Sequence, residues 1–248
     1  MSSRTSFLRA ILDAPEEDAP RLVYADWLEE QGDPRGEFIR LQVEAARGAD
    51  PLRRRELQRS AAAILEIHEA EWLAPIRSFL ARWQFRRGFV EAIDIETLHF
   101  LSRAERIWEV EPVTSMNLLG VGQFGSAIAV VPQLTHLRRL NVGIHATLGD
   151  DGFEPLTTTP YLVNLRVLNA WGCRLGDASA RAIAVSPNLH RLSILDLSNN
   201  RIGSSGAFAL ARSPYLQHIS KIRLYRNAIG TEAAQGLRVR FGRNVVLD

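Results

Sequence analysis

The stretch LSILDLSNNRIG (residues 192–203) carries the pattern around which the rest of the chain is organised. It follows the form L-x-x-L-x-L-x-x-N-x-I-G, with fixed positions at Leu192, Leu195, Leu197, Asn200 and Ile202. The stretches LRVLNAWGCRLG (165–176) and ISKIRLYRNAIG (219–230) on either side have the same spacing. Because self-similarity at a fixed period is typical of repeat architectures, the sequence predicts a repeat protein.

Six units can be aligned on their first strand position, at successive spacings of 23, 24, 28, 27 and 27 residues. The aligned residues are Ile93, Met116, Leu140, Leu168, Leu195 and Ile222. This period is that of leucine-rich repeats, in which each unit is a short strand and a helix. The units are similar to the ribonuclease-inhibitor type. That resemblance implies a right-handed α/β solenoid with parallel strands on the concave side and helices on the convex side.

Within each unit the residue types indicate separate roles. Leu195 and Leu197 flank one residue of a strand, so both side chains should point into the core. Asn200 and Asn227 stand where the chain turns, and their amides can satisfy backbone groups that the turn leaves unpaired. Residues 244–247 are expected to add a closing strand.

The front of the chain predicts three helices between residues 4 and 47. Asp18 is expected to cap the second helix, Gly32 to end it, and Asp33-Pro34 to start the third. The run LVYADWLEEQGDPRGEFIRLQ (22–42) resembles the bacterial repeat-companion domain, a short module found ahead of leucine-rich repeats. The resemblance implies a fold and a domain order, and no known activity.

Several charged residues of that run could suggest an acid–base site: Asp26, Glu29, Glu30, Asp33, Arg35 and Glu37. We interpret them as helix caps and solvated charge, which is what most surface charges are. A DNA-binding helix-turn-helix is disfavoured because residues 1–50 hold six arginines against eleven acidic residues, a net charge of −5.

The sequence therefore predicts three segments: a three-helix repeat-companion domain over 1–48, connecting helices and an N-terminal cap over 49–87, and leucine-rich repeats over 88–248. Asp50 and Pro51 are expected to start the connecting helix. The aromatic stretch SFLARWQFRRGFV (78–90) is interpreted as a plug for the open end of the first repeat, because a solenoid's terminal core needs a cap.

Composition narrows the class of protein further. The 248 residues are 46% hydrophobic and 23% charged, with a net charge of +2, as in an ordinary globular protein. One cysteine excludes a disulfide within the chain. The N-terminal stretch does not have the pattern of a signal peptide, and no apolar run is long enough to span a membrane, so we expect a cytoplasmic protein.

Two motifs that suggest chemistry are better explained by the repeats. The glycines of GVGQFG (120–125) match a dinucleotide-binding fingerprint, but Asn141 stands where that fingerprint needs an acid. Cys173 and His145 occupy the Asn position of adjacent units, where a small buried side chain is expected rather than a catalytic pair. We predict no enzyme activity, no metal site and no small-molecule cofactor.

Binding is predicted on the concave strand face, where alternate strand residues point outward. The predicted partner-binding residues are Arg139, Asn141, Asn169, Trp171, Asp196, Ser198, Lys221, Arg223 and Tyr225. Large aromatics beside Arg on an open face are typical anchors of protein interfaces, which favours a non-enzymatic interaction module or adaptor for another protein. The alternative is nucleic-acid or polyanion binding, because residues 111–248 hold fourteen basic against eight acidic residues, a net charge of +6.

Overall fold

The computed structural model describes residues 3–48, 50–143 and 148–248. The chain forms two compact units. Residues 1–93 and 105–114 make up the N-terminal unit, and residues 94–104 and 115–248 make up the C-terminal unit. Strand β2 (Phe89–Glu96) and helix α5 (Thr97–Val110) each continue from one unit into the other. These boundaries differ from the divisions at 48 and 87 expected from the sequence.

The N-terminal unit contains four helices: α1 (Ser3–Asp13), α2 (Ala19–Glu30), α3 (Arg35–Ala46) and α4 (Pro51–Leu73). Local signals explain several of their ends. Gly32, with φ of 71°, follows α2 in the left-handed conformation that favours glycine. The Asp50 carboxylate accepts hydrogen bonds from the amides of Leu52 (3.0 Å) and Arg53 (3.1 Å), so that predicted cap is confirmed.

The predicted Asp18 cap is wrong. Asp18 stands before α2 but its carboxylate makes no capping bond. It pairs with the guanidinium groups of Arg47 (2.8 Å) and Arg87 (3.4 Å) instead. An ion pair to a distant arginine therefore outcompetes the backbone amides of the following helix for this carboxylate.

The aromatic stretch forms a hairpin of β1 (Leu80–Arg86) and β2, preceded by a short 3₁₀ turn at Arg77–Phe79. Arg87 and Gly88 form its two-residue loop, with φ of 47° and 89°, the signs that a tight hairpin turn requires. Phe89 packs in a core with Tyr24 and Ile39, and Phe85 packs against Phe38 and Trp72. These aromatic residues thus belong to the core of the N-terminal unit, a role that the sequence did not indicate.

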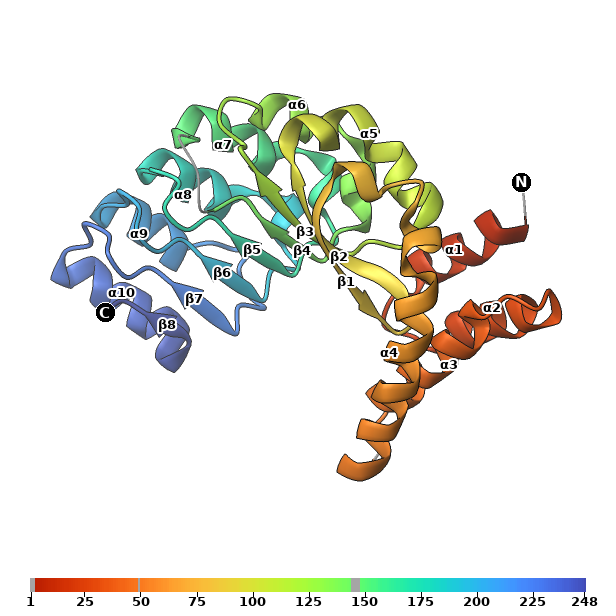
Figure 1. Ribbon diagram of the computed structural model, residues 1–248. Coiled ribbons are helices and arrows are strands. Elements are labelled where there is room, and N and C mark those ends of the chain that lie inside the picture. The colour runs from red at the N-terminus through yellow and green to blue at the C-terminus, as the bar shows by residue number, and fades with distance from the viewer. Residues whose placement is uncertain (1–2, 49, 144–147) are drawn as a thin grey trace. The chain divides into compact units, whose positions relative to one another are not determined.

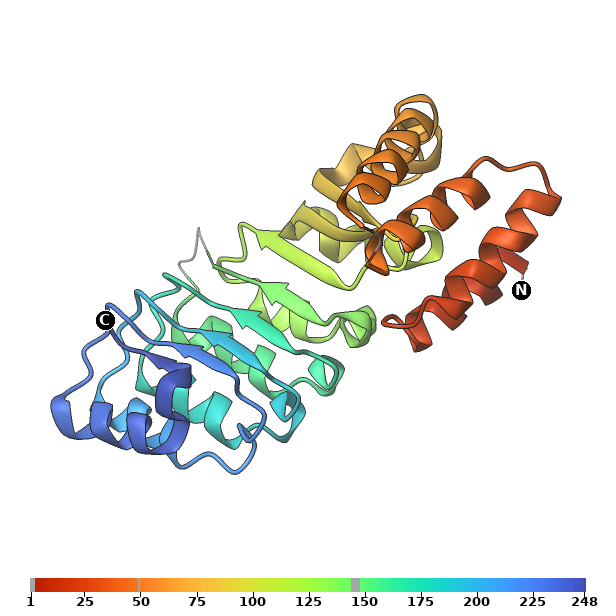
Figure 2. The ribbon, with the colours of Figure 1, turned by 90° about the horizontal axis from the view of Figure 1, so that it is seen from below.

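The C-terminal unit is an α/β repeat solenoid (Figure 1). Its strands are β3 (Ser115–Leu119), β4 (Arg139–Asn141), β5 (Val167–Asn169), β6 (Ile194–Asp196), β7 (Lys221–Arg223) and β8 (Val245–Val246). They run parallel in chain order, side by side in Figure 2. The aligned residues Met116, Leu140, Leu168, Leu195 and Ile222 pair in register, as the repeat spacing predicted. The closing strand expected near residue 245 is also confirmed, as β8.

The helices of this unit cover the other side of the strands (Figure 1). They are α6 (Gly125–Ala129), α7 (Gly149–Thr158), α8 (Asp177–Val185), α9 (Ser204–Ala211) and α10 (Thr231–Phe241). Short 3₁₀ turns lie at Pro132–His136, Pro160–Leu162, Pro187–Leu189 and Gly242–Asn244. Helix α8 packs against α7 and α9, and α9 packs against α10, so each repeat buries the apolar side of its neighbour.

Carboxylates of one repeat cap the helix of the next. Asp150 accepts hydrogen bonds from the amides of Gly176 (2.8 Å) and Ser179 (3.1 Å) at the start of α8, and from the Ser179 hydroxyl. Asp177 accepts from the amides of Gly203 (2.7 Å) and Gly206 (2.9 Å) at the start of α9. These bonds supply partners for amides that a helix N-terminus leaves unpaired. Burial has the largest effect on the Asp150 carboxyl and raises its pKa, but the hydrogen bonds together lower the pKa overall.

Hydroxyl groups make a matching set of contacts beyond the helix C-termini. Each belongs to a Ser or Thr before a proline and donates to a carbonyl of the preceding repeat: Thr159 to Ala129 (2.5 Å), Ser186 to Thr157 (2.5 Å) and Ser213 to Ala184 (2.6 Å). All three hydroxyl residues are buried. The repeats are therefore joined by side-chain hydrogen bonds at both ends of the helical layer.

The predicted asparagine brace is confirmed at Asn200. Its amide nitrogen donates to the carbonyl oxygens of Ala170 (2.9 Å) and Leu197 (2.9 Å), and its oxygen accepts from the Leu175 amide (3.0 Å). Asn227 repeats this pattern with Leu197, Leu224 and Ile202 one unit later. The Cys173 thiol takes the same place one unit earlier and donates to the Val142 carbonyl (3.4 Å).

The glycines at 120–125 serve chain geometry. Gly120 and Gly122 have φ of 66° and 44°, in the left-handed region. A Cβ atom at Gly125 would overlap the carbonyl oxygen of Gly152 in α7, so this glycine lets α6 approach the next helix closely. The motif is accounted for by turns and close packing between repeats.

Candidate functional site

The strand face of the C-terminal unit brings the predicted binding residues together in two aligned rows. The first row consists of Arg139, Val167, Ile194 and Lys221, and the second of Asn141, Asn169, Asp196 and Arg223. Arg139 and Lys221 are exposed, and the second row is half-buried. The parallel register thus places residues from four repeats on one continuous surface.

The second row has a common local geometry. The side-chain oxygens of Asn141, Asn169 and Asp196 each accept a hydrogen bond from the amide two residues later, at 2.9, 2.9 and 3.0 Å. Side-chain oxygens of Asn and Asp commonly hold the backbone in this way. The consequence at Asn141 and Asn169 is that the oxygen is engaged while the amide nitrogen, a donor, has no partner among the described residues.

A third row follows at the ends of the strands. Backbone hydrogen bonds continue from the Gly172 amide to the Ser198 carbonyl and from the Asn199 amide to the Tyr225 carbonyl, both about as long as in the strands, at 3.0 and 2.9 Å. Trp171, Ser198 and Tyr225 therefore lie at equivalent positions of successive repeats, just beyond the ends of β5, β6 and β7. The two aromatic side chains are half-buried.

The expectation that Ser198 faces a partner is wrong. Its exposed fraction is 0%, and its buried hydroxyl has no hydrogen-bond partner among the described residues. The outward position in the repeat did not reveal this burial. Ser198 thus separates Trp171 from Tyr225 without being available for contact.

The face carries an excess of positive charge. Asp196 accepts a contact from Arg223 across the strands at 3.3 Å, so these two charges offset each other. Within the described part of the chain, Arg139 and Lys221 have no ion-pair partner. Arg226, next to Tyr225, is also exposed and unpaired there, and its φ of 55° is unusual for a long side chain. A ligand on this face therefore meets cations that have no ion-pair partner among the described residues.

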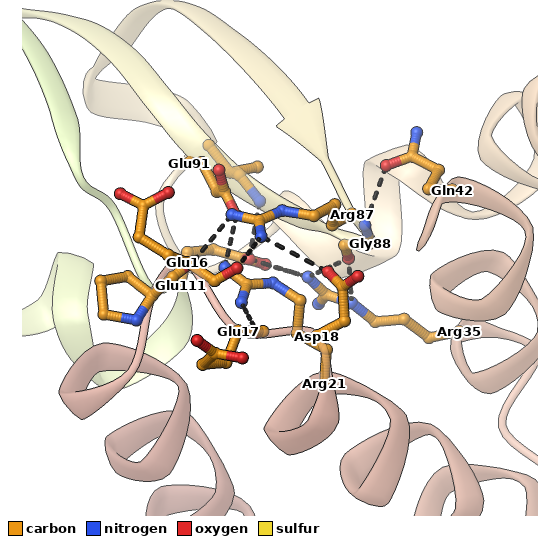
Figure 3. A network of polar contacts seen from close by, with 12 residues as sticks. Glu16, Glu17, Asp18, Arg21, Arg35, Gln42, Arg87, Gly88, Glu91 and Glu111 are labelled. Atoms are coloured by element: carbon orange, nitrogen blue, oxygen red, sulfur yellow. Dashed lines mark hydrogen bonds and ion pairs between the residues drawn. The ribbon is translucent and has the colours of Figure 1, made fainter. Parts of the chain in front are cut away.

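A second polar cluster lies in the N-terminal unit, and Figure 3 shows its residues turned toward one another. Arg35, only 2% exposed, binds both carboxylate oxygens of Glu111 at 2.7 and 2.8 Å. Its guanidinium also donates to the Gly88 carbonyl and lies over the rings of Trp72 and Phe89. The interpretation of Arg35 as solvated charge is therefore wrong.

Arg21, with an exposed fraction of 0%, completes this cluster. It donates to Glu91 at 2.5 Å and to the Glu17 carbonyl at 2.7 Å. Burial lowers the pKa of Arg21, against the opposing effect of Glu91. Arg87 pairs with Glu91 at 3.1 Å, and its guanidinium also donates to the carbonyls of Pro15 and Glu16 (Figure 3). Because each carboxylate here is neutralised by arginine, the cluster is suited to holding α2, α3 and the hairpin together rather than to moving protons.

The remaining chemical candidates are unreactive or absent. Cys173 is fully buried, and burial raises the pKa of its thiol to about 12, so the nucleophilic thiolate is scarce at neutral pH. Its suggested partner His145 lies outside the described residues. Within residues 3–48, 50–143 and 148–248, no group of three or more His, Cys, Asp or Glu is arranged to hold a metal ion.

Comparison with known proteins bears on the repeats. Residues 188–211, which contain β6 and α9, match the family model described as Leucine Rich repeat. This match identifies one leucine-rich repeat, over residues 188–211. No curated protein matches the chain significantly. Among solved structures the chain is similar to a structural-genomics target from Bacteroides fragilis, with 18% identity, a TM-score of 0.40 and coverage of 55% of this chain. The match covers 41% of that protein, so the chain spans less than half of its length.

No helix among the described residues combines the length and the apolar character needed to cross a membrane.

Proposed function

We propose that this protein is a non-enzymatic interaction module whose leucine-rich repeats bind another protein on their strand face. The observation that carries the proposal is the placement of Trp171 and Tyr225 on one face, on repeats separated by a single intervening repeat, beside donors and cations that have no partner among the described residues. Tyr, Trp and Arg are the residues in which protein interfaces concentrate their binding energy. Leucine-rich repeats are, in general, protein-interaction modules, which supports the same proposal.

The test is capture of the partner by the protein and by a double variant, Trp171→Ala with Tyr225→Ala. Affinity capture from the native cell with cross-linking, followed by mass spectrometry, should recover a partner with the wild type and lose it with the double variant. Tyr215→Ala is a matched control, because Tyr215 is a half-buried aromatic of the same unit that lies outside the strand face. Circular dichroism checks that the variants fold. Undiminished capture by the double variant would refute the proposal.

Polyanion binding is the second candidate, and it is favoured by Arg139 and Lys221, which are exposed and have no ion-pair partner among the described residues. Binding of this kind falls steeply with salt, because each phosphate contact releases counterions. Fluorescence anisotropy with a labelled oligonucleotide should then show a steep salt dependence that Arg139→Ala and Lys221→Ala reduce. Binding that is absent at low salt would remove this candidate.

We also propose that residues 1–48 are a repeat-companion domain of a cytoplasmic protein. The three helices α1 to α3 lie where that resemblance places them, which supports the proposal. Tyr24 and Ile39 of these helices share a core with Phe89 of the hairpin, so we expect a chain lacking residues 1–48 to expose that core and aggregate. Size-exclusion chromatography of residues 49–248 tests this; a stable monomer would contradict it.

A further inference from the structure

We infer that the strand face takes an acidic, proline-rich segment of another protein in the polyproline II conformation. This inference rests on the proposed function, because it names the class of partner for the same face. Three observations carry it: the spacing of the two aromatic residues, the surplus of hydrogen-bond donors, and the sign of the charge around them.

The spacing comes from the register. Ser198 holds the equivalent position in the repeat between those of Trp171 and Tyr225, so the two aromatic residues lie two strand spacings apart, about 9.5 Å. A polyproline II helix repeats every three residues, at about 3.1 Å each, and thus presents the same face every 9.3 Å or so. A segment crossing the strands would therefore meet one aromatic side chain at each of two successive turns.

The side chains at this level alternate in size across the strands. Gly143 adjoins the backbone of Trp171, and Ser198 lies between Trp171 and Tyr225. Both small residues are buried, whereas the aromatic ones keep part of their surface accessible. Proline-rich segments bind to aromatic surfaces of this kind, and their preformed conformation lowers the entropy cost of binding.

The hydrogen-bonding groups of the face match those of such a segment. Proline has no backbone N–H, and a polyproline II helix has no internal hydrogen bonds, so its carbonyls remain as acceptors. The face offers donors. The amide nitrogens of Asn141 and Asn169 have no partner among the described residues, while their oxygens are held by Gly143 and Trp171. The indole N–H of Trp171 is likewise unpaired among those residues.

The charges on the face favour acidic rather than basic residues beside the prolines of the segment. Arg139, Lys221 and Arg226 are exposed and lack ion-pair partners among the described residues, whereas the one carboxylate in the rows of β4 to β7, Asp196, is already paired with Arg223. Acidic residues beside the prolines would pair with these cations. A basic segment would meet uncompensated repulsion.

The test is fluorescence anisotropy of a labelled nonaproline with two glutamates at each end, titrated with the full chain. We expect it to bind at least tenfold more tightly than two comparison peptides, one with glycine in place of every proline and one with lysine flanks. Trp171→Ala with Tyr225→Ala should weaken binding by roughly 30-fold or more. Trp171→Phe, which keeps a ring but removes the N–H donor, should cause a smaller loss, and Tyr215→Ala should cause none.

Equal binding of the glycine peptide would overturn the inference, as would tighter binding of labelled oligothymidylate than of the nonaproline. The two proposals remain distinguishable. If a captured partner depends on Trp171 and Tyr225 but the nonaproline does not bind, the polyproline inference fails and the proposed function stands. If capture and peptide binding are both insensitive to these residues, both fail.

Discussion

Replacing Asn200 by alanine tests the asparagine brace between repeats. The change removes the acceptor of the Leu175 amide and the donor to the Ala170 carbonyl, both on residues with no exposed surface. Leu197 keeps a partner for its carbonyl, because Asn227 also donates to it. Leaving a buried backbone group unpaired costs about 1–3 kcal/mol. Two such groups should lower the free energy of unfolding by about 2–6 kcal/mol.

Urea denaturation followed by circular dichroism measures this loss. With a slope of roughly 2 kcal/mol per molar urea, the midpoint should fall by about 1–3 M. Asn188→Ala is the matched control, because its single amide bond to the Thr158 carbonyl is exposed and water can replace it. The loss of stability for Asn200→Cys should lie between those of the two alanine variants, since Cys173 makes the equivalent bond to the Val142 carbonyl. A loss no greater for Asn200→Ala than for Asn188→Ala would refute the reasoning.

Three further predictions follow from the buried and capping groups. Glu111→Gln leaves the Arg35 guanidinium buried without its anion, so urea unfolding should show a loss of about 3–5 kcal/mol, and a loss below about 1 kcal/mol would contradict the buried pair. Asp150→Ala should cost about 1 kcal/mol at neutral pH as a lost helix cap. Because the pKa of Asp150 is lowered by folding, this contribution is complete above the unfolded pKa near 3.9 and is lost as the pH falls through the lower folded value. Thermal melts of wild type and variant should therefore converge in strong acid, and a gap independent of pH would show that the carboxylate charge is irrelevant. The Cys173 thiol, with its pKa raised to about 12, should resist a thiol reagent at pH 8 in the folded protein and react on addition of urea. Rapid reaction without urea would show that the site opens.

The amino-acid sequence alone determined the repeat architecture and its register. The reason is physical: strand side chains alternate between two faces, and a slip of one residue would expose every leucine. The spacing of Leu140, Leu168, Leu195 and Ile222 was therefore enough to predict which residues pair. The hydrogen bonding of Asn200 at the turn and the helix cap at Asp50 could also be predicted, because both side chains bind backbone groups a few residues away or at a fixed repeat distance.

Tertiary structure decided what depends on distant partners. The sequence indicated solvated charge at Arg35 and no special role for Arg21, yet both are buried, and Glu91 and Glu111, 70 and 76 residues away, neutralise them. The sequence predicted Asp18 as a helix cap, but in the folded protein its carboxylate pairs with Arg47 and Arg87 instead. Ser198 occupies the same position in its repeat as Trp171 and Tyr225 do in theirs, but it is fully buried whereas they are half-buried. Local pattern thus set the direction in which each strand side chain points, and only the assembled repeats set which of those side chains a partner can reach.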